Sequence, residues 1–342
     1  MSTSWYDEVL QNQKTYVIAE IGSNFGGDLS LARDYVHACA KSGADAVKFQ
    51  SWNTSTLQNG IDQKTGQPSA AIPVLQKYEL PIEWHVQLKQ ECDTVGVDFL
   101  STPFDLDRAD LLNEIGCRAI KIASGDLTYT QLLRRVGRMG LPVILSTGMS
   151  DYAEIEAALD ALGDARKNTI LLHCVGAYPP DISDANLRAI PNMANFFNLP
   201  IGFSDHYPGD ATAIGAVALG ARVIEKHVTF SRDAGHPDSP FAMEMNEFSQ
   251  MIARIREIES ALGNGEKRCM RTEQGGRIGG RRSLYWRRSM EEGCSVSELD
   301  MAALRPAEGQ FEPRHMESLV GKKLVRPVLA GQLVNYADFV NE

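Results

Sequence analysis

The chain has no apolar run long enough to span a bilayer, although 43% of its 342 residues are hydrophobic. Its first residues, MSTSWYDEVLQNQKT, are polar and lack the apolar core of a signal peptide. These two absences predict a cytoplasmic protein that does not associate with membranes. The length suits one large domain and one small one.

The chain also lacks a surplus of basic residues, because its formal net charge is −10. A nucleic-acid partner would require a basic face, so none is expected. An anionic substrate would instead have to enter a locally positive pocket. The six cysteines contain no CxxC pair, which makes a zinc site built from thiolates unexpected.

Short β-branched runs alternate with helical patterns along most of the chain. Expected strands cover residues 16–21, 46–49, 98–101, 119–122, 143–146, 169–173, 201–204 and 222–227. Expected helices cover residues 29–42, 82–95, 107–115, 130–139, 152–162, 184–197, 210–219 and 247–262. No GxGxxG follows the first strand, as a dinucleotide-binding open sheet would need. The pattern therefore predicts an α/β fold, a closed (β/α)8 TIM barrel, in preference to a doubly wound sheet.

Two histidines follow or end neighbouring strands near the end of this pattern. His206 comes directly after strand 201–204, and His227 ends strand 222–227. Parallel strands joined by a helix have carboxyl ends on the same side, so these imidazoles can meet there, close to Asp205 and Glu225. Such a pair suits a divalent metal with open positions. The alternative is two unrelated histidines, one in a loop and one in the core.

Two lysines occupy apolar strands, Lys48 in VKF and Lys121 in IKIAS. A lysine inside a barrel costs free energy unless it meets an anion. Nearby serines and amides complete an expected cradle for phosphate and carboxylate groups. They are Ser124, Ser146, Ser204 and the amides of Gly125 and Gly148. The alternative is that both lysines point outward between helices.

The composition changes after the last expected helix. Residues 263–282 are rich in Gly and Arg and are interpreted as a linker. The expected domains are a barrel at 1–265, a linker at 266–282 and a small domain at 283–342 with short strands in SLYWRR and KKLVRPVL. About sixty residues is a marginal size for independent stability, so the small domain should lean on another surface.

Motifs along nearly the whole chain resemble those of the sialic acid synthase family, the phosphoenolpyruvate-dependent nonulosonic acid synthases. They are AEIGSN (19–24), GADAVKFQ (43–50), STPFD (101–105), KIASGDL (121–127), LSTGM (145–149), GFSDH (202–206), VIEKHVT (223–229) and RRSLY (281–285). The resemblance implies a (β/α)8 barrel followed by a small antifreeze-like (SAF) domain. It also implies a domain-swapped homodimer, in which one small domain closes the partner's barrel.

The resemblance further implies an N-acetylneuraminate synthase-type transferase. Such an enzyme condenses phosphoenolpyruvate with an N-acetylhexosamine, N-acetylmannosamine or a related sugar, to a nine-carbon 2-keto sugar acid and phosphate. The alternatives are a pseudaminic or legionaminic acid synthase using a 2,4-diacetamido-trideoxyhexose, or a non-catalytic sugar-binding relative. A further rival, a barrel that condenses phosphoenolpyruvate with an aldose phosphate, is disfavoured by the appended small domain.

The family's functional residues carry over to matching positions. The resemblance implies that His206 and His227 hold a divalent metal, most often Mn2+, with Mg2+ or Co2+ as options. It assigns phosphoenolpyruvate to Lys48, Thr102, Lys121, Ser124, Ser146 and Ser204, with Tyr178 nearby. It assigns the sugar to Glu20, Asp126 and Asp238, with Arg305 reaching it from the partner subunit. Glu20, Lys48, Lys121 and Asp126 are the expected catalytic residues, and Glu20 handles protons.

Three positions depart from the family's pattern. Phe25 follows Asn24 where a histidine is usual, Asp126 stands where Glu is frequent, and Gly176 replaces a small polar residue. These departures bear on which sugar is used rather than on the type of reaction.

Overall fold

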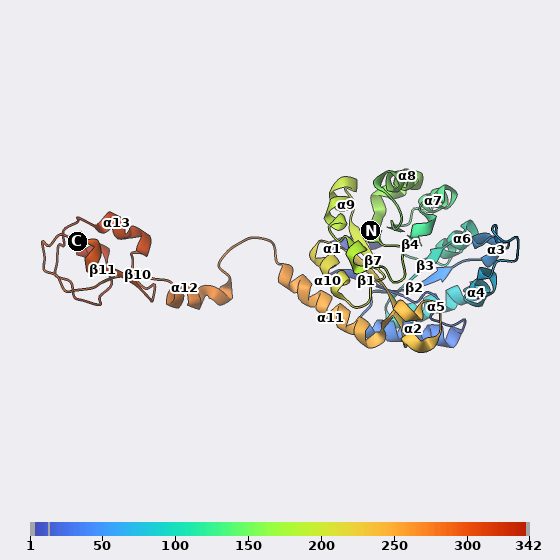
Figure 1. The fold of residues 1–342 in the computed structure, drawn as a ribbon, viewed down its shortest axis with the longest axis horizontal. Coiled ribbons are helices and arrows are strands. Elements are labelled where there is room, and N and C mark those ends of the chain that lie inside the picture. Colours follow the sequence, from blue (N-terminus) through green and yellow to red (C-terminus); the bar gives the residue numbers. More distant parts are fainter. Residues whose placement is uncertain (1–3, 13, 340–342) are drawn as a thin grey trace. The chain divides into compact units, whose positions relative to one another are not determined.

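The computed structural model describes residues 4–12 and 14–339. They belong to two compact units, Met1–Gly263 and Asn264–Glu342 (Figure 1).

The first unit is an eight-stranded parallel barrel, as predicted. Its strands are β1 (Tyr16–Glu20), β2 (Ala46–Ser51), β3 (Asp98–Pro103), β4 (Ile120–Ile122), β5 (Val143–Ser146), β6 (Thr169–Cys174), β7 (Ile201–Asp205) and β8 (Val223–Thr229). The hydrogen-bonded order is β3-β2-β1-β8-β7-β6-β5-β4, and β3 and β4 lie side by side, which nearly closes the ring. The short strand β9 (Met243–Glu244) pairs with β8.

Helices follow the strands and surround them (Figure 1). They are α2 (Leu29–Ser42), α5 (Ile82–Val95), α6 (Leu106–Glu114), α7 (Thr130–Gly137), α8 (Tyr152–Leu162), α9 (Ala189–Phe197), α10 (Ala211–Ala218) and α11 (Met245–Leu262). The expected helix at 184–197 begins later, because Asn186 adopts a left-handed conformation after a 3-10 turn. Gly43 ends α2 in the left-handed conformation that its missing Cβ permits.

The inward-facing side chains of the strands form two layers of different character. The lower layer is apolar, with Ile18, Ala46, Leu100, Ala119, Ile144, Ile170, Leu172 and Val223 in one cluster. Two residues further along each strand, the same face carries polar groups at the carboxyl ends. They include Glu20, Lys48, Thr102, Lys121, Ser146, Cys174, Ser204 and Glu225. The two-residue repeat of a strand therefore places the polar layer directly on an apolar floor.

Helix α1 (Trp5–Gln11), which the sequence analysis did not predict, seals this floor from below. Its buried residues Trp5 and Val9 belong to the same apolar cluster as the lower layer. The Trp5 indole donates to the Asp98 carboxylate (3.1 Å), to which the Tyr16 hydroxyl also donates (2.6 Å). Ordered residues at the chain's start thus close the end of the barrel opposite the polar layer.

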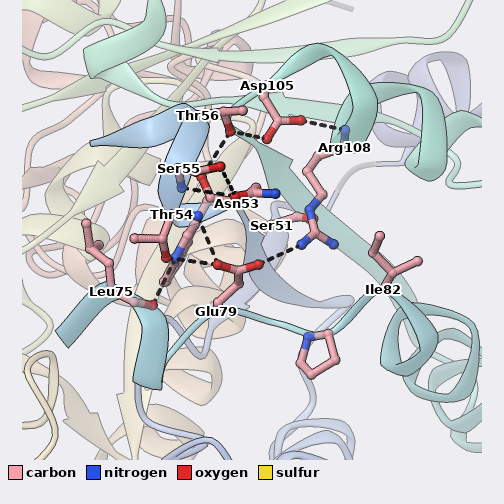
Figure 2. A network of polar contacts seen from close by, with 12 residues as sticks. Ser51, Asn53, Thr54, Ser55, Thr56, Leu75, Glu79, Ile82, Asp105 and Arg108 are labelled. Atoms are coloured by element: carbon pink, nitrogen blue, oxygen red, sulfur yellow. Dashed lines mark hydrogen bonds and ion pairs between the residues drawn. The ribbon is translucent and has the colours of Figure 1, made fainter. Parts of the chain in front are cut away.

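A long excursion joins β2 to α5 and was also not predicted in detail. It contains α3 (Thr54–Leu57) and α4 (Ala71–Lys77), and no residue of α4 is buried. Figure 2 shows how its two ends are tied: the Glu79 carboxylate accepts from the backbone (2.9 Å) and hydroxyl (2.8 Å) of Thr54 and from Arg108 (3.2 Å). Thr56 in turn donates to Asp105, the residue that caps α6 (2.7 Å). The excursion is therefore clamped at its base.

In the second unit, the strand expected in SLYWRR is confirmed, whereas the second expected strand and part of the expected linker have other structures. Residues expected to form a linker contain helix α12 (Gln274–Gly280), and the backbone amide of Ala307 donates to the carbonyl of Ile278 (2.8 Å). The sheet consists of β10 (Ser283–Trp286) and β11 (Met301–Leu304), with helix α13 (Met316–Leu319) nearby in sequence. KKLVRPVL, expected as a strand, forms isolated bridges only, at Lys323 and Val328. A separate apolar core around Trp286 and Phe311 holds this unit together.

Across the described residues, no helix combines the length and the apolar character needed to cross a membrane.

Candidate active site at the carboxyl ends of the strands

Lys48 and Lys121 point into the barrel rather than outward. Both are buried, with exposed fractions of 2% and 3%. The Lys48 ammonium pairs with the Glu20 carboxylate and donates to the Thr102 hydroxyl (3.2 Å). The Lys121 ammonium donates to the Ser146 hydroxyl (2.6 Å) and to the carbonyl of Ile122 (3.1 Å). Each lysine is therefore fixed by partners from neighbouring strands.

Glu225 joins the two lysines. Its Oε1 lies 3.6 Å from the Lys48 ammonium, and its Oε2 lies 3.9 Å from that of Lys121. Ser204 donates to the same carboxylate (3.2 Å). Burial alone would raise the pKa of Glu225, but the two ammonium groups lower it to about 2, so the carboxylate is charged. Burial opposes the charge of Lys48, yet Glu20 and Glu225 together raise its pKa, whereas burial lowers the pKa of Lys121.

Within this candidate site, the sequence reasoning gave Glu225 the smallest part. The reasoning placed it near the histidines but did not pair it with the lysines. Its partners lie on strands β2 and β4, and sequence spacing does not give the positions of side chains across a barrel. Gln50, at the end of β2, had no assigned role, and its side-chain amide donates to Glu20 (2.8 Å).

The two histidines meet above this charged layer. Their ring centroids lie 5.4 Å apart, and the centroid of the Tyr178 ring lies 4.2 Å from that of His206, with the two planes tilted by 37°. Nδ1 of His206 lies 3.0 Å from the carbonyl of Val175. Because a carbonyl can only accept, Nδ1 carries the proton and Nε2 keeps a free lone pair. Burial and the neighbouring His227 lower the pKa of His206 to about 3, so the ring is neutral.

Nδ1 of His227 is buried and has no hydrogen-bond partner among the described residues. It faces Gly22, where a Cβ would lie 3.3 Å from this nitrogen and only 2.1 Å from the Asp238 carboxylate. Gly22 also has a φ of +54°, so a glycine is required there on both grounds. Its small size brings the loop that carries Asp238 close to His227.

Asp238 is held by a reciprocal pair of hydrogen bonds with Ser23. The Ser23 amide donates to the Asp238 carboxylate (2.7 Å), and the Asp238 amide donates to the Ser23 hydroxyl (3.1 Å). Asn24 is also structural, because it donates to the carbonyl of Val228 (2.8 Å) and accepts from Ser239 (2.8 Å). The loop after β8 is thus fastened to the loop after β1.

Ser124 and Asp126 lie in a 3-10 turn that follows β4. The Gly148 amide donates to the Ser124 hydroxyl (3.0 Å), which links the loops after β4 and β5. Burial raises the pKa of Asp126 to about 6, although Lys121 opposes this shift, and its Oδ2 has no hydrogen-bond partner among the described residues. This carboxylate is available to a ligand.

Phe25 and Gly176, two of the departures from the family's pattern, lie in different surroundings. Phe25 is buried in the core and packs edge-on against Phe49 and Trp84, so its side chain leaves the polar layer unchanged. At Gly176, a Cβ would lie 3.0 Å from the Met149 side chain. Arg305, the remaining expected site residue, is exposed in the second unit.

Comparisons with known proteins show the family of the chain. Residues 35–267 match the model of the NeuB family, and residues 281–340 match that of the SAF domain. The chain belongs to the NeuB family. This is the family of nonulosonic acid synthases that the motifs predicted, and its members are transferases dependent on phosphoenolpyruvate.

Individual NeuB relatives differ in their products. The chain is 38% identical to the N,N'-diacetyllegionaminic acid synthase of Campylobacter jejuni, with 90% of this chain and 95% of the relative covered. It is 32% identical to a pseudaminic acid synthase from the same species, covering 96% and 97%. It resembles the crystal structure of the N-acetylneuraminic acid synthetase of Leptospira borgpetersenii, with 35% identity, a TM-score of 0.71, and 77% and 90% coverage. The family is therefore clear, whereas the sugar differs among its members.

Proposed function

We propose that this protein condenses phosphoenolpyruvate with an N-acetylated hexose, forming a nine-carbon 2-keto sugar acid and releasing phosphate. The observation that carries the proposal is the pair of buried, ion-paired lysines beneath two neighbouring histidines at the carboxyl ends of the strands. This end is where (β/α)8 enzymes have their active sites.

Phosphoenolpyruvate would lie against the positive and hydroxyl groups of the polar layer. These are Lys48, Thr102, Lys121, Ser124, Ser146 and Ser204. The lysines would balance the carboxylate and phosphate charges from fixed positions, which requires no reorganisation during the reaction. Glu20 lies beside Lys48 and accepts from Gln50, so it can hold or move a proton for the water that adds to C2.

The histidine pair fits a divalent metal. Nε2 of His206 has its lone pair free, and the buried Nδ1 of His227 has no partner among the described residues. Those residues contain no cluster of three or more His, Cys, Asp or Glu side chains suited to a metal. His206 and His227 would therefore hold the ion as a pair and leave positions open. A bound Mn2+ or similar cation would supply Lewis-acid polarisation of the sugar's aldehyde.

The sugar would extend from the metal towards the outer loops. Asp126, with a free carboxylate oxygen, and Asp238, beside His227, are placed to contact its hydroxyl groups, and Tyr178 would form a wall. Arg305 would reach the N-acetyl group from the partner in a homodimer. The chain is 38% identical to a legionaminic acid synthase and 35% identical to the N-acetylneuraminic acid synthetase. This difference favours a 2,4-diacetamido-trideoxyhexose over N-acetylmannosamine.

The test is phosphate release from phosphoenolpyruvate with a panel of sugars, each with and without a chelator. The panel holds N-acetylmannosamine, mannose and the 2,4-diacetamido-trideoxyhexoses of the legionaminic and pseudaminic types. We expect metal-dependent release with one diacetamido sugar. Lys121→Met should abolish release, while Lys167→Met, which removes an exposed lysine, should leave it unchanged. Folded protein that releases no phosphate with any sugar would refute the proposal.

A further inference from the structure

The anion site of this barrel already contains an anion of its own. The Glu225 carboxylate, only 5% exposed, lies between the two lysines, with one oxygen nearest to each ammonium. It also receives the hydroxyl hydrogen of Ser204 (3.2 Å). These three donors are the groups that a phosphate or carboxylate of a substrate would use.

The charges of this layer balance without any ligand. Glu20 and Glu225 supply two negative charges, and Lys48 and Lys121 supply two positive ones. Oε2 of Glu225 is buried, has no hydrogen-bond partner among the described residues, and lies 3.9 Å from the Lys121 ammonium. A phosphate approaching Lys121 therefore meets a like charge at close range, where burial leaves little screening.

The lysines do not depend on Glu225 for their positions. Lys121 is held by Ser146 (2.6 Å) and by the carbonyl of Ile122 (3.1 Å), and Lys48 is held by Glu20 and Thr102. Removing the charge of Glu225 should thus leave two anchored ammonium groups, of which only that of Lys48 is paired with a carboxylate, Glu20.

We propose that Glu225 is an internal counter-ion that occupies the anion site between turnovers and weakens its affinity for phosphate. It would pair with both lysines while the site is empty, and it would help phosphate to leave once it has formed. The proposal rests on the proposed function for the identity of the physiological anion. It makes Glu225 a residue that tunes affinity by its charge and needs no part in bond making.

The experiment measures the binding of inorganic phosphate to chelator-treated protein by calorimetry. Glu225→Gln keeps the size of the side chain but removes its charge, so phosphate should bind at least about tenfold more tightly than in the wild type. Glu83→Gln, on the exposed side of α5, is the matched control and should bind like the wild type. If Glu225 only supported the structure of the site, Glu225→Gln would damage the site and bind phosphate more weakly than the wild type.

Unchanged or weaker phosphate binding in folded Glu225→Gln protein would overturn the proposal. If this variant does not fold, Glu225→Asp takes its place. Its carboxylate is withdrawn from the lysines, so phosphate binding should still tighten, and equal affinity would overturn the proposal.

The measurement needs neither sugar nor turnover, so it is separate from the test of the reaction. An inactive wild type whose Glu225→Gln variant binds phosphate more tightly would refute the reaction but support the counter-ion. In an active enzyme, the same variant should show stronger inhibition by product phosphate.

Discussion

His85 is buried behind β2, and both of its ring nitrogens have partners. Nδ1 lies 2.9 Å from the carbonyl of Pro81, and Nε2 lies 2.7 Å from the hydroxyl of Ser51. The carbonyl must accept, so Nδ1 carries the proton and Nε2 accepts from Ser51. Burial, assisted by the nearby charge of Arg108, lowers the pKa of His85 to about 4.

This shift predicts a loss of stability in acid. The unfolded chain binds a proton near the usual histidine pKa of 6.5, whereas the folded protein resists protonation until about pH 4. The free energy of unfolding is therefore unaffected by His85 protonation above pH 6.5. It decreases as the pH falls below this value, by up to about 3 kcal/mol. Denaturant unfolding between these pH values should show a steeper dependence for the wild type than for His85→Gln. Equal slopes would contradict the assignment.

Lys226 and Asp205 form a buried ion pair that faces the helices rather than the site. The ammonium lies 2.8 Å from the carboxylate and also donates to the carbonyls of Tyr207 and Gly209. Lys226→Met leaves a buried carboxylate without its partner and should lower the free energy of unfolding by about 3–5 kcal/mol. Combining it with Asp205→Asn removes that charge, so chemical denaturation should show the double variant to be more stable than Lys226→Met. A double variant that loses the sum of both single effects would argue against pairing.

At the scale of elements, the excursion between β2 and α5 combines a fixed base with an exposed body. Figure 2 shows Glu79 joining Thr54 at its start to Arg108 on α6. The guanidinium of Arg108 is itself buried, so the clamp is anchored in the barrel wall. The short helix α4 contributes no buried residue.

Glu79→Gln should therefore release the excursion without unfolding the barrel. It removes the charge that Arg108 pairs with and weakens the acceptor for Thr54. We expect limited proteolysis within residues 57–77 to become several-fold faster, with a small change in Tm. Glu83→Gln serves as the control on α5. Unaltered cleavage, or cleavage spread over the whole barrel, would show that Glu79 is no local clamp.

The elements that were predicted well are those with a strong local pattern. The strands of the barrel are β-branched runs, and helices such as α2 and α5 have apolar positions at helical spacing with a terminal glycine. Helices α1 and α4 were missed because their sequences are polar or too short for a period. In the second unit, KKLVRPVL forms single bridges, which local sequence does not distinguish from a strand. The lysines and histidines of the site were found by motif, but the pairing of Glu225 with both lysines depends on the closed ring.

At the scale of the whole molecule, the basic residues concentrate in one stretch of an acidic chain. Lys267, Arg268, Arg271, Arg277, Arg281, Arg282, Arg287 and Arg288 lie in the second unit. The Arg305 loop in this unit is held by Tyr285, whose hydroxyl donates to the carbonyl of Pro306 (2.8 Å), and by Ser283, which accepts from the Gly309 amide (2.9 Å). The backbone of this loop is thus fixed, while the Arg305 side chain is exposed.

If Arg305 acts on the partner's barrel, two inactive variants should complement each other. Arg305→Ala and His206→Ala homodimers should each lack activity, while mixing them forms heterodimers with one complete site. Phosphate release should then recover to about a quarter of the wild-type rate in an equal mixture, because half of the dimers are mixed. No recovery, once mass spectrometry shows that heterodimers have formed, would place Arg305 in its own subunit's site or outside any site.

The two layers inside the barrel separate residues needed for folding from residues needed for chemistry. The apolar floor contains Ile18, Ile144 and Val223, while the chemistry lies two residues further along the same strands. Substitutions in the apolar floor should lower the free energy of unfolding. Substitutions in the polar layer should mainly lower activity. A lineage could therefore exchange one sugar acid for another without first acquiring a new scaffold. The apolar layer would then stay nearly constant, while the polar layer and the loops above it would change.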